Sequence, residues 1–297
     1  MVLDFKCGYV AIIGYPNVGK STLLNGLIGE RLAITSPKPQ TTRHRILGIL
    51  NRPGAQLLFL DTPGMLKPRS ALHQSLVKAV MEALSSADVV VWLTDPRPPV
   101  PGDEVLVPQL RQLTKPLIVA INKIDRIAKP EILPLIAAYH ELFPQAPVVP
   151  ISALLGDGLS ILVEEIIKVL PTAPPLFPED YLTDKSERFL VAELIRQRLL
   201  HHLGEEIPHA AAVVIEEFDE SRRPELVKIR AVIYVEKDSQ KGIVIGKGGR
   251  VLKAVGREAR EEIEHLLEAK VFLDLWVKVW KNWRRDPKAV RAMGYEA

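Results

Sequence analysis

The segment GYPNVGKST, residues 14–22, constrains the fold of this chain more than any other. It fits the pattern G-x-x-x-x-G-K-[ST], follows the apolar run GYVAIIG and opens the helix-like stretch KSTLLNGLIG. A glycine-rich turn between a buried strand and a helix directs backbone N–H groups toward a phosphate. The segment therefore predicts a phosphate-binding loop, in which Lys20 reaches the β and γ phosphates and Ser21 coordinates Mg²⁺.

Three further motifs follow in chain order, each at the end of an expected strand. DTPG, residues 61–64, supplies a carboxylate that can hold magnesium through water and, at Gly64, an N–H for the γ-phosphate. NKID, residues 122–125, ends in Asp125, whose carboxylate can accept from N1–H and the 2-amino group of guanine. ISAL, residues 151–154, would close over the base. Adenine lacks the paired N1–H and 2-amino donors of guanine, so the four motifs together predict GTP or GDP rather than ATP.

The order of segments predicts two domains joined by a short linker. Residues 8–170 alternate strand-like and helix-like stretches, which indicates an α/β domain, residues 1–170, with a mostly parallel sheet covered on both faces. LPTAPPLFPED contains four prolines and predicts an extended linker over residues 171–180. Residues 181–297 follow the order helix, strand, strand, helix, loop, helix, strand, which predicts a smaller α+β domain with a basic C-terminal tail.

A second glycine loop lies in this smaller domain, within IVIGKGGRV. Three residues separate Gly242 from Gly246, one fewer than in the first loop, and no hydroxyl follows Lys247, so a second triphosphate site is not expected. Residues 246–249 instead match the G-x-x-G loop with which KH domains clamp single-stranded nucleic acid. The helix-first order is that of a type II KH domain. We expect the RNA-binding residues to be Ile245, Gly246, Lys247, Gly248, Gly249, Arg250, Lys253 and Arg257.

Charge and composition are compatible with this interpretation. The net charge of +3 is small, but residues 237–260 hold seven basic and two acidic residues, and residues 278–291 hold six and one. Segregated charge of this kind can present one basic face to nucleic acid. The single cysteine, Cys7, excludes an intrachain disulfide. We expect no signal peptide and no membrane span, because no sufficiently long apolar run occurs.

Taken together, GYPNVGKS, PQTTRHR, DTPG, NKID and SAL resemble the Era family of bacterial GTPases, and the resemblance covers nearly the whole chain. It implies that PQTTR is switch I, that residues 61–70 are switch II, and that Thr42 is the second Mg²⁺ ligand. Spacing alone leaves Thr41 as the alternative. The resemblance also implies a monomer that acts in the cytoplasm in small (30S) ribosomal subunit biogenesis. It would bind ribosomal RNA near the 3′ end of the small-subunit RNA, with loose peripheral association at the inner face of the cell membrane.

Hydrolysis is expected to be slow. Met65 stands where many switch GTPases place a glutamine that orients the attacking water. In related GTPases with PNVGKS-type loops, the asparagine that matches Asn17 helps to hold a potassium ion near the phosphates, so K⁺ is an expected second cation. The residues expected in catalysis are Asn17, Lys20, Thr42 and Gly64, and those expected to bind metal are Ser21, Thr42 and Asp61. The residues expected around GTP are Gly14, Tyr15, Pro16, Asn17, Val18, Gly19, Lys20, Ser21, Thr22, Thr41, Thr42, Asp61, Thr62, Pro63, Gly64, Asn122, Lys123, Asp125, Ser152, Ala153 and Leu154.

Two alternative functions fit the same motifs. One is a nucleotide-gated RNA-binding module in which turnover is incidental, and the other is a membrane-surface regulatory GTPase whose basic face meets anionic lipid. The aromatic residues Trp276, Trp280 and Trp283 leave a further choice open. They can stack bases, but we expect them to pack in the core or between the domains.

Overall fold

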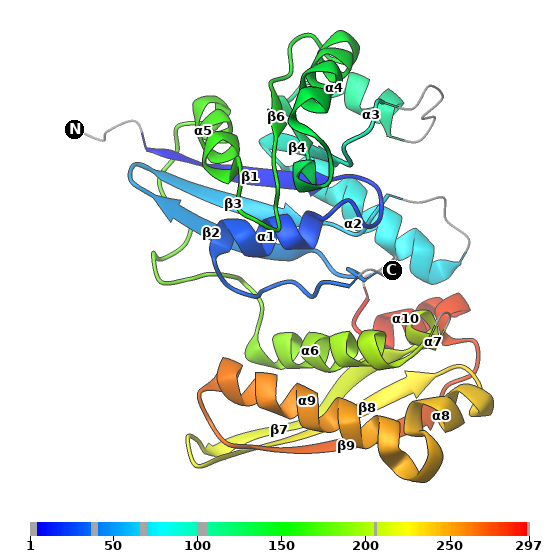
Figure 1. The fold of residues 1–297 in the computed structure, drawn as a ribbon. Coiled ribbons are helices and arrows are strands. Elements are labelled where there is room, and N and C mark those ends of the chain that lie inside the picture. The colour runs from blue at the N-terminus through cyan, green and yellow to red at the C-terminus, as the bar shows by residue number, and fades with distance from the viewer. Residues whose placement is uncertain (1–4, 37–40, 66–69, 100–105, 205–206, 296–297) are drawn as a thin grey trace. The chain divides into compact units, whose positions relative to one another are not determined.

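The computed structural model describes the chain except for residues 1–4, 37–40, 66–69, 100–105, 205–206 and 296–297. The chain divides into two compact units, and in its later part the division falls between Asp184 and Lys185 (Figure 1). Each unit has a hydrophobic core of its own.

A six-stranded sheet in the order β2-β3-β1-β4-β5-β6 forms the first unit. Only the β2–β3 pair is antiparallel, and the other neighbours run parallel. The expected α/β class with a mostly parallel sheet is therefore confirmed. The strands are β1 (Lys6–Ile13), β2 (Ile46–Arg52), β3 (Ala55–Asp61), β4 (Val89–Thr94), β5 (Leu117–Ile121) and β6 (Val148–Pro150).

Apolar side chains on both faces of this sheet explain why helices cover it twice. One face of β1, with Ala11 and Ile13, packs in a core with buried residues of α2, α3 and α4. Val10 and Ile12 point to the other face, where the buried side chains of α1 and α5 lie. The helices are α1 (Lys20–Ile28), α2 (Ala71–Ser86), α3 (Val107–Arg111), α4 (Lys129–Leu142) and α5 (Leu159–Val169), with the short 3₁₀ turn η1 (Ile124–Arg126).

Parallel strands bring their carboxyl ends to one edge of the sheet. The phosphate loop follows β1, residues 61–64 follow β3, residues 122–125 follow β5 and residues 151–154 follow β6. The four motifs of the sequence therefore meet at a single edge, as their positions predict.

The proline-rich segment is attached to the first unit by backbone hydrogen bonds along its length. Cys7 N donates to Pro171 O at 3.1 Å, Ala173 N donates to Phe5 O at 3.0 Å, and Ile49 N donates to Leu182 O at 2.8 Å. The segment has no helix and no strand, and it bends at residues 176–177 and turns at residues 179–180. It runs along the first unit, which extends to Asp184.

The second unit is a three-stranded sheet with its packed helices on one face. Alternate residues of β8, such as Ile229 and Ile233, are buried against α6 and α9, while Lys228 and Arg230 are exposed. The β8–β9 pair is parallel and the β7–β8 pair antiparallel. The elements are α6 (Glu187–His202), α7 (Ile207–Ala210), β7 (Ala212–Arg222), β8 (Leu226–Val235), α8 (Asp238–Ile245), η2 (Lys247–Gly249), α9 (Arg250–Leu267) and β9 (Val271–Val279).

The basic C-terminal tail is folded. It forms η3 (Trp283–Arg285) and α10 (Pro287–Ala292), which Asp286 caps by accepting from Lys288 N. Trp283 is fully buried, donates from Nε1 to Ala210 O at 2.9 Å and stacks on Tyr295. Trp283 is thus a core residue, whereas Trp276 on β9 and the following Trp280 are 55% and 37% exposed.

Candidate nucleotide-binding and nucleic-acid-binding sites

The phosphate loop connects β1 to α1 and surrounds a buried lysine. Lys20 Nζ donates to Gly14 O at 3.2 Å and to Tyr15 O at 2.9 Å. Burial lowers the pKa of Lys20 to about 8, and the nearby Asp61 carboxylate partly opposes that shift. A buried ammonium among backbone groups at a helix N-terminus favours a phosphate as its counter-ion.

Beside this lysine, two hydroxyls and one carboxylate converge. Ser21 Oγ donates to Asp61 Oδ2 at 2.7 Å and lies 2.8 Å from Thr42 Oγ1. Asp61 is fully buried, and its Oδ1 has no hydrogen-bond partner among the described residues. Burial raises the pKa of Asp61 to about 6, against the opposing effect of Lys20.

These three groups fit a magnesium ion. Hard oxygen ligands, few of them from protein, are what Mg²⁺ takes when phosphates and water complete its shell. Within the described ranges, no group of three or more His, Cys, Asp or Glu side chains forms an alternative metal site. The unpartnered oxygen of Asp61 is an acceptor that such a cation, or its water, would satisfy. Thr41 is also buried, but the contact with Ser21 is made by Thr42.

The DTPG segment lies directly against the phosphate loop. Thr62 Oγ1 donates to Ile12 O at 2.8 Å, and a Cβ added to Gly64 would stand 2.7 Å from Pro16 N. Only glycine fits at so close an approach. Met65 N donates to Gly14 O at 3.1 Å, and the Met65 side chain is buried in the core. The residue at the usual glutamine position is therefore turned away from the phosphates.

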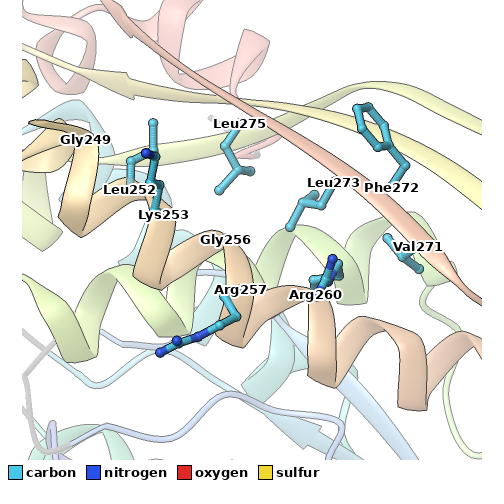
Figure 2. A pocket seen from close by; sticks show the side chains of 10 residues that line it. All are labelled: Gly249, Leu252, Lys253, Gly256, Arg257, Arg260, Val271, Phe272, Leu273 and Leu275. Carbon is cyan, nitrogen blue, oxygen red and sulfur yellow. The ribbon is translucent and has the colours of Figure 1, made fainter.

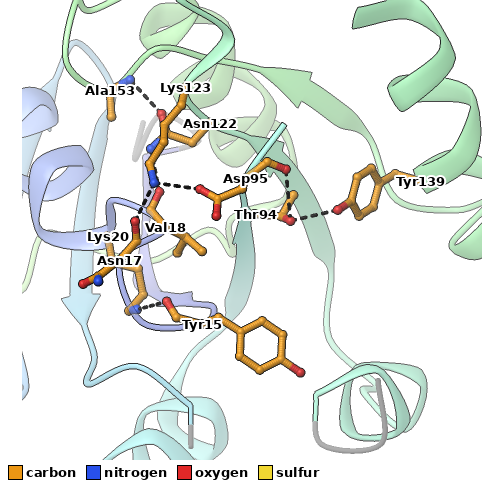
Figure 3. Close-up of polar contacts among 10 residues, drawn as sticks. All are labelled: Tyr15, Asn17, Val18, Lys20, Thr94, Asp95, Asn122, Lys123, Tyr139 and Ala153. Carbon is orange, nitrogen blue, oxygen red and sulfur yellow. Dashed lines mark hydrogen bonds and ion pairs between the residues drawn. The ribbon is translucent and has the colours of Figure 1, made fainter. Parts of the chain in front are cut away.

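Asn122 joins the base end of the site to the phosphate loop (Figure 3). Its Nδ2 donates to Val18 O at 2.8 Å, and its Oδ1 accepts from Ala153 N at 2.9 Å. One carboxamide thereby ties three of the motifs together. This bridge explains why an asparagine stands at position 122, since its side chain must donate and accept at once.

The carboxylate of Asp125, which is predicted to select guanine, is held in place but remains accessible. Ser152 Oγ donates to Asp125 Oδ1 at 2.6 Å and accepts from Leu155 N at 3.2 Å. Asp125 is exposed, as is Leu154, so a base can reach both. The structure thus brings together residues from all four motifs.

Both expected switch segments are only partly described, and one charged residue near the site was not predicted. Parts of both expected switch segments, residues 39–40 and 66–69, lie outside the described residues. Asp95, at the end of β4, forms a 2.7 Å ion pair with Lys123. Asp95 was not among the predicted site residues, although its place just after the carboxyl end of a central strand was a usable signal.

The second glycine loop joins α8 to α9 in the other unit. Gly246, Gly248 and Gly249 have φ values of 74°, 63° and 78°, a region that side chains disfavour. Lys247, Gly248 and Arg250 are exposed. The loop thus presents glycine backbone and two cations at the N-terminus of an 18-residue helix, where anions are favoured.

A groove of about 470 Å³ extends from this loop between α9 and β9 (Figure 2). Exposed Lys253, Arg257 and Arg260 succeed one another along α9, and Leu273 and Leu275 point from β9 toward the helix. Arg260 was not among the predicted RNA-binding residues, although it lies one turn beyond Arg257. The groove is lined by Gly249, Leu252, Lys253, Gly256, Arg257, Arg260, Val271, Phe272, Leu273 and Leu275.

Apolar walls with a cationic side suit single-stranded nucleic acid, in which bases and phosphates lie on different sides of the chain.

None of the helices in the described part of the chain has the length and hydropathy of a bilayer-spanning segment.

Comparison with known families assigns both units. Residues 9–123 match the family described as 50S ribosome-binding GTPase, and residues 206–284 match the KH domain family. Among curated proteins, the GTPase Era of Geotalea uraniireducens is 47% identical over 294 residues, covering 99% of each chain. The GTPase Era of Alkaliphilus metalliredigens is 45% identical over 295 residues, covering 99% of this chain and 100% of the other.

Two solved structures match over both units. Era in complex with MgGDPNP and nucleotides 1506–1542 of 16S ribosomal RNA is 45% identical, with a TM-score of 0.94, and the match covers 99% of this chain and 100% of that one. A variant of Aquifex aeolicus Era bound to GDP and AlF₄⁻ also gives 45% identity and a TM-score of 0.94, covering 98% of this chain and 100% of that one. Identity at this level over the full length of both units shows that the chain belongs to the family of the GTPase Era.

Proposed function

We propose that this chain binds and slowly hydrolyses GTP with Mg²⁺, and that its KH domain binds single-stranded 16S ribosomal RNA near the 3′ end during assembly of the small ribosomal subunit. One observation carries the proposal: the chain matches, over both units, an Era structure that holds MgGDPNP and nucleotides 1506–1542 of that RNA. The geometry supports it at each site, with a buried lysine and an unpartnered carboxylate oxygen in one unit and a basic-sided groove in the other.

In this proposal, each group at the nucleotide site has a defined task. Lys20 and the loop amides bind the β and γ phosphates, and Gly64 N–H meets the γ-phosphate. Ser21, Thr42 and Asp61 hold the magnesium ion, which supplies positive charge opposite the charge that develops on the phosphates. Asp125 selects guanine, while Asn122 holds the phosphate loop and the segment of residues 151–154 in fixed positions relative to each other.

Residues of the second unit position the RNA. The backbone of residues 246–249 approaches the sugar-phosphate chain, while Lys247, Arg250, Lys253 and Arg257 supply positive charge. The apolar walls from Leu252, Leu273 and Leu275 take the bases. The family resemblance further supports a cytoplasmic monomer, with peripheral contact at the inner face of the cell membrane as part of the same proposal.

Comparing alanine substitutions at the two adjacent threonines tests the magnesium site. Because Thr42 Oγ1, not that of Thr41, contacts Ser21, Thr42→Ala should lower the single-turnover GTPase rate by about tenfold or more, a loss of about 1.4 kcal/mol of transition-state stabilisation. Excess Mg²⁺ should recover part of that rate. Thr41→Ala should stay within about threefold of the wild type, a barrier change below 1 kcal/mol. The reverse ranking would assign the ligand to Thr41, and equal wild-type rates would remove switch I from the metal site.

A further inference from the structure

The ammonium group of Lys123 lies between a backbone carbonyl of the phosphate loop and the carboxylate that follows the neighbouring strand β4 (Figure 3). Its Nζ donates to Asn17 O in the phosphate loop at 2.6 Å and lies 2.7 Å from Asp95 Oδ1. The register of β4 with β5 pairs Thr94 with Ile121, so the residues that follow each strand stand side by side at the carboxyl edge. The Asp95 contact is an ion pair rather than a directed hydrogen bond.

The loop that carries Asp95 is anchored to the body of the domain. Tyr139 OH, from α4, lies 2.8 Å from Thr94 Oγ1 and donates to Arg97 O at 3.0 Å. The Tyr139 ring is buried and meets Trp92 edge-on, with ring centroids 5.3 Å apart. Residues on both sides of Asp95 are thus held by one rigid aromatic side chain, which gives the carboxylate a fixed support.

The ion pair is sufficiently shielded from solvent to affect the position of the ammonium group. The side chains of Lys123 and Asp95 are 23% and 29% exposed. Lysine has a flexible four-carbon stem, and an ammonium group alone does not fix its direction. A carboxylate on rigid support restricts that freedom and keeps the ammonium where it donates to Asn17 O.

We propose that Asp95 is a positioning residue of the GTP site. It holds Lys123 against the phosphate-loop carbonyl of Asn17, which keeps that loop closed on bound nucleotide and slows release of guanine nucleotide. The proposal rests on the proposed nucleotide site and extends it to a group that does not touch the base. Base selection stays with Asp125, so the two residues have separable effects.

Release of a fluorescent GDP analogue from the full chain, in saturating Mg²⁺, measures this effect. Asp95→Asn keeps the shape of the side chain but removes its charge, and should speed release about fivefold, the change expected for loss of one partly exposed charged contact. Lys123→Met should speed release at least as much. The double variant should release no faster than Lys123→Met alone, since Asp95 acts only through that lysine. Glu141→Gln, an exposed acidic residue of α4, should behave as the wild type.

A base competition separates failure of this proposal from failure of the nucleotide site itself. Asp125→Asn should shift the preference from GDP toward the xanthine nucleotide, and an unchanged preference would remove Asp125 from the base site. Asp95→Asn should keep the preference for GDP and release both GDP and the xanthine nucleotide faster than the wild type does. A wild-type release rate for Asp95→Asn would overturn the positioning role. The same would follow if Asp95→Asn sped release in the Lys123→Met protein as much as it does in the wild type. Asp95→Ala enters the same cycle if circular dichroism shows that the asparagine variant is unfolded.

Discussion

At the scale of single residues, GTP hydrolysis depends on what this site has in place of an orienting glutamine. Met65 is buried in the core and can neither donate to nor accept from a water. The remaining groups stabilise charge on the phosphates but do not orient the nucleophile. Asn17 is exposed in the phosphate loop, with a φ of 64°. Its side-chain oxygen is a suitable ligand for a monovalent cation beside the phosphates.

We predict that GTP hydrolysis is slow and that its rate rises about threefold or more when potassium replaces sodium. A threefold rise corresponds to lowering the activation barrier by less than about 1 kcal/mol. The potassium ion would stand where an arginine finger otherwise supplies charge. Turnover should be measured at equal ionic strength with magnesium saturating, and Asn17→Ala should lose most of the difference between the two salts. Identical rates in both salts would remove potassium from the mechanism and leave the GTPase assignment intact.

At the scale of secondary-structure elements, a buried glutamine adds side-chain hydrogen bonds to the backbone ones that hold the proline-rich segment on the sheet. Gln56 on β3 is fully buried. Its Oε1 accepts from Leu176 N at 2.8 Å and from Phe177 N at 3.0 Å, and its Nε2 donates to Phe177 O at 2.8 Å and to Asn51 Oδ1 at 2.9 Å. A carboxamide that makes all these contacts replaces the water that an extended backbone otherwise binds.

Gln56→Leu should destabilise the first unit by about 2–3 kcal/mol, because it removes a buried carboxamide and leaves partly buried backbone groups of residues 176 and 177 without partners. Urea denaturation measures the loss, and hydrogen exchange should show faster exchange at those two amides. Gln145→Leu, at an exposed position, is the matched control and should change stability by less than about 0.5 kcal/mol. Unaltered exchange at residues 176 and 177 would show that the segment is held by other contacts.

The elements also show how far the sequence could be interpreted. Apolar runs, glycine loops and motif order were sufficient for the α/β sheet, the KH element order and the convergence of Lys20, Asp61 and Asp125. These features depend on local pattern and on the rule that parallel strands share an edge. The contacts of Gln56 and Asp95 could not be predicted, because each joins segments far apart in the chain through one polar side chain. The β9 wall of the groove was not predicted either, because which strand lies beside α9 is decided by tertiary packing.

At the scale of the whole molecule, the proposed function assigns two different anions to the two glycine loops. The first surrounds a buried lysine and lies beside a carboxylate, which suits a triphosphate with its metal. The second is exposed, has no carboxylate in the lining of its groove and opens along a helix with three successive cations. Because each unit has its own core, a change in the second loop should leave the first site intact.

A titration of labelled RNA with the full chain and a non-hydrolysable GTP analogue tests this division of labour most directly. The RNA should correspond to the 3′ end of 16S ribosomal RNA. Gly248→Asp places a negative charge where a phosphate approaches, whereas Gly54→Asp adds the same side chain at another glycine with positive φ and open space around it. We predict that Gly248→Asp lowers RNA affinity about tenfold or more with nucleotide affinity unchanged, and that Gly54→Asp binds RNA like the wild type. Wild-type RNA affinity in a folded Gly248→Asp protein that still binds GTP would contradict the account.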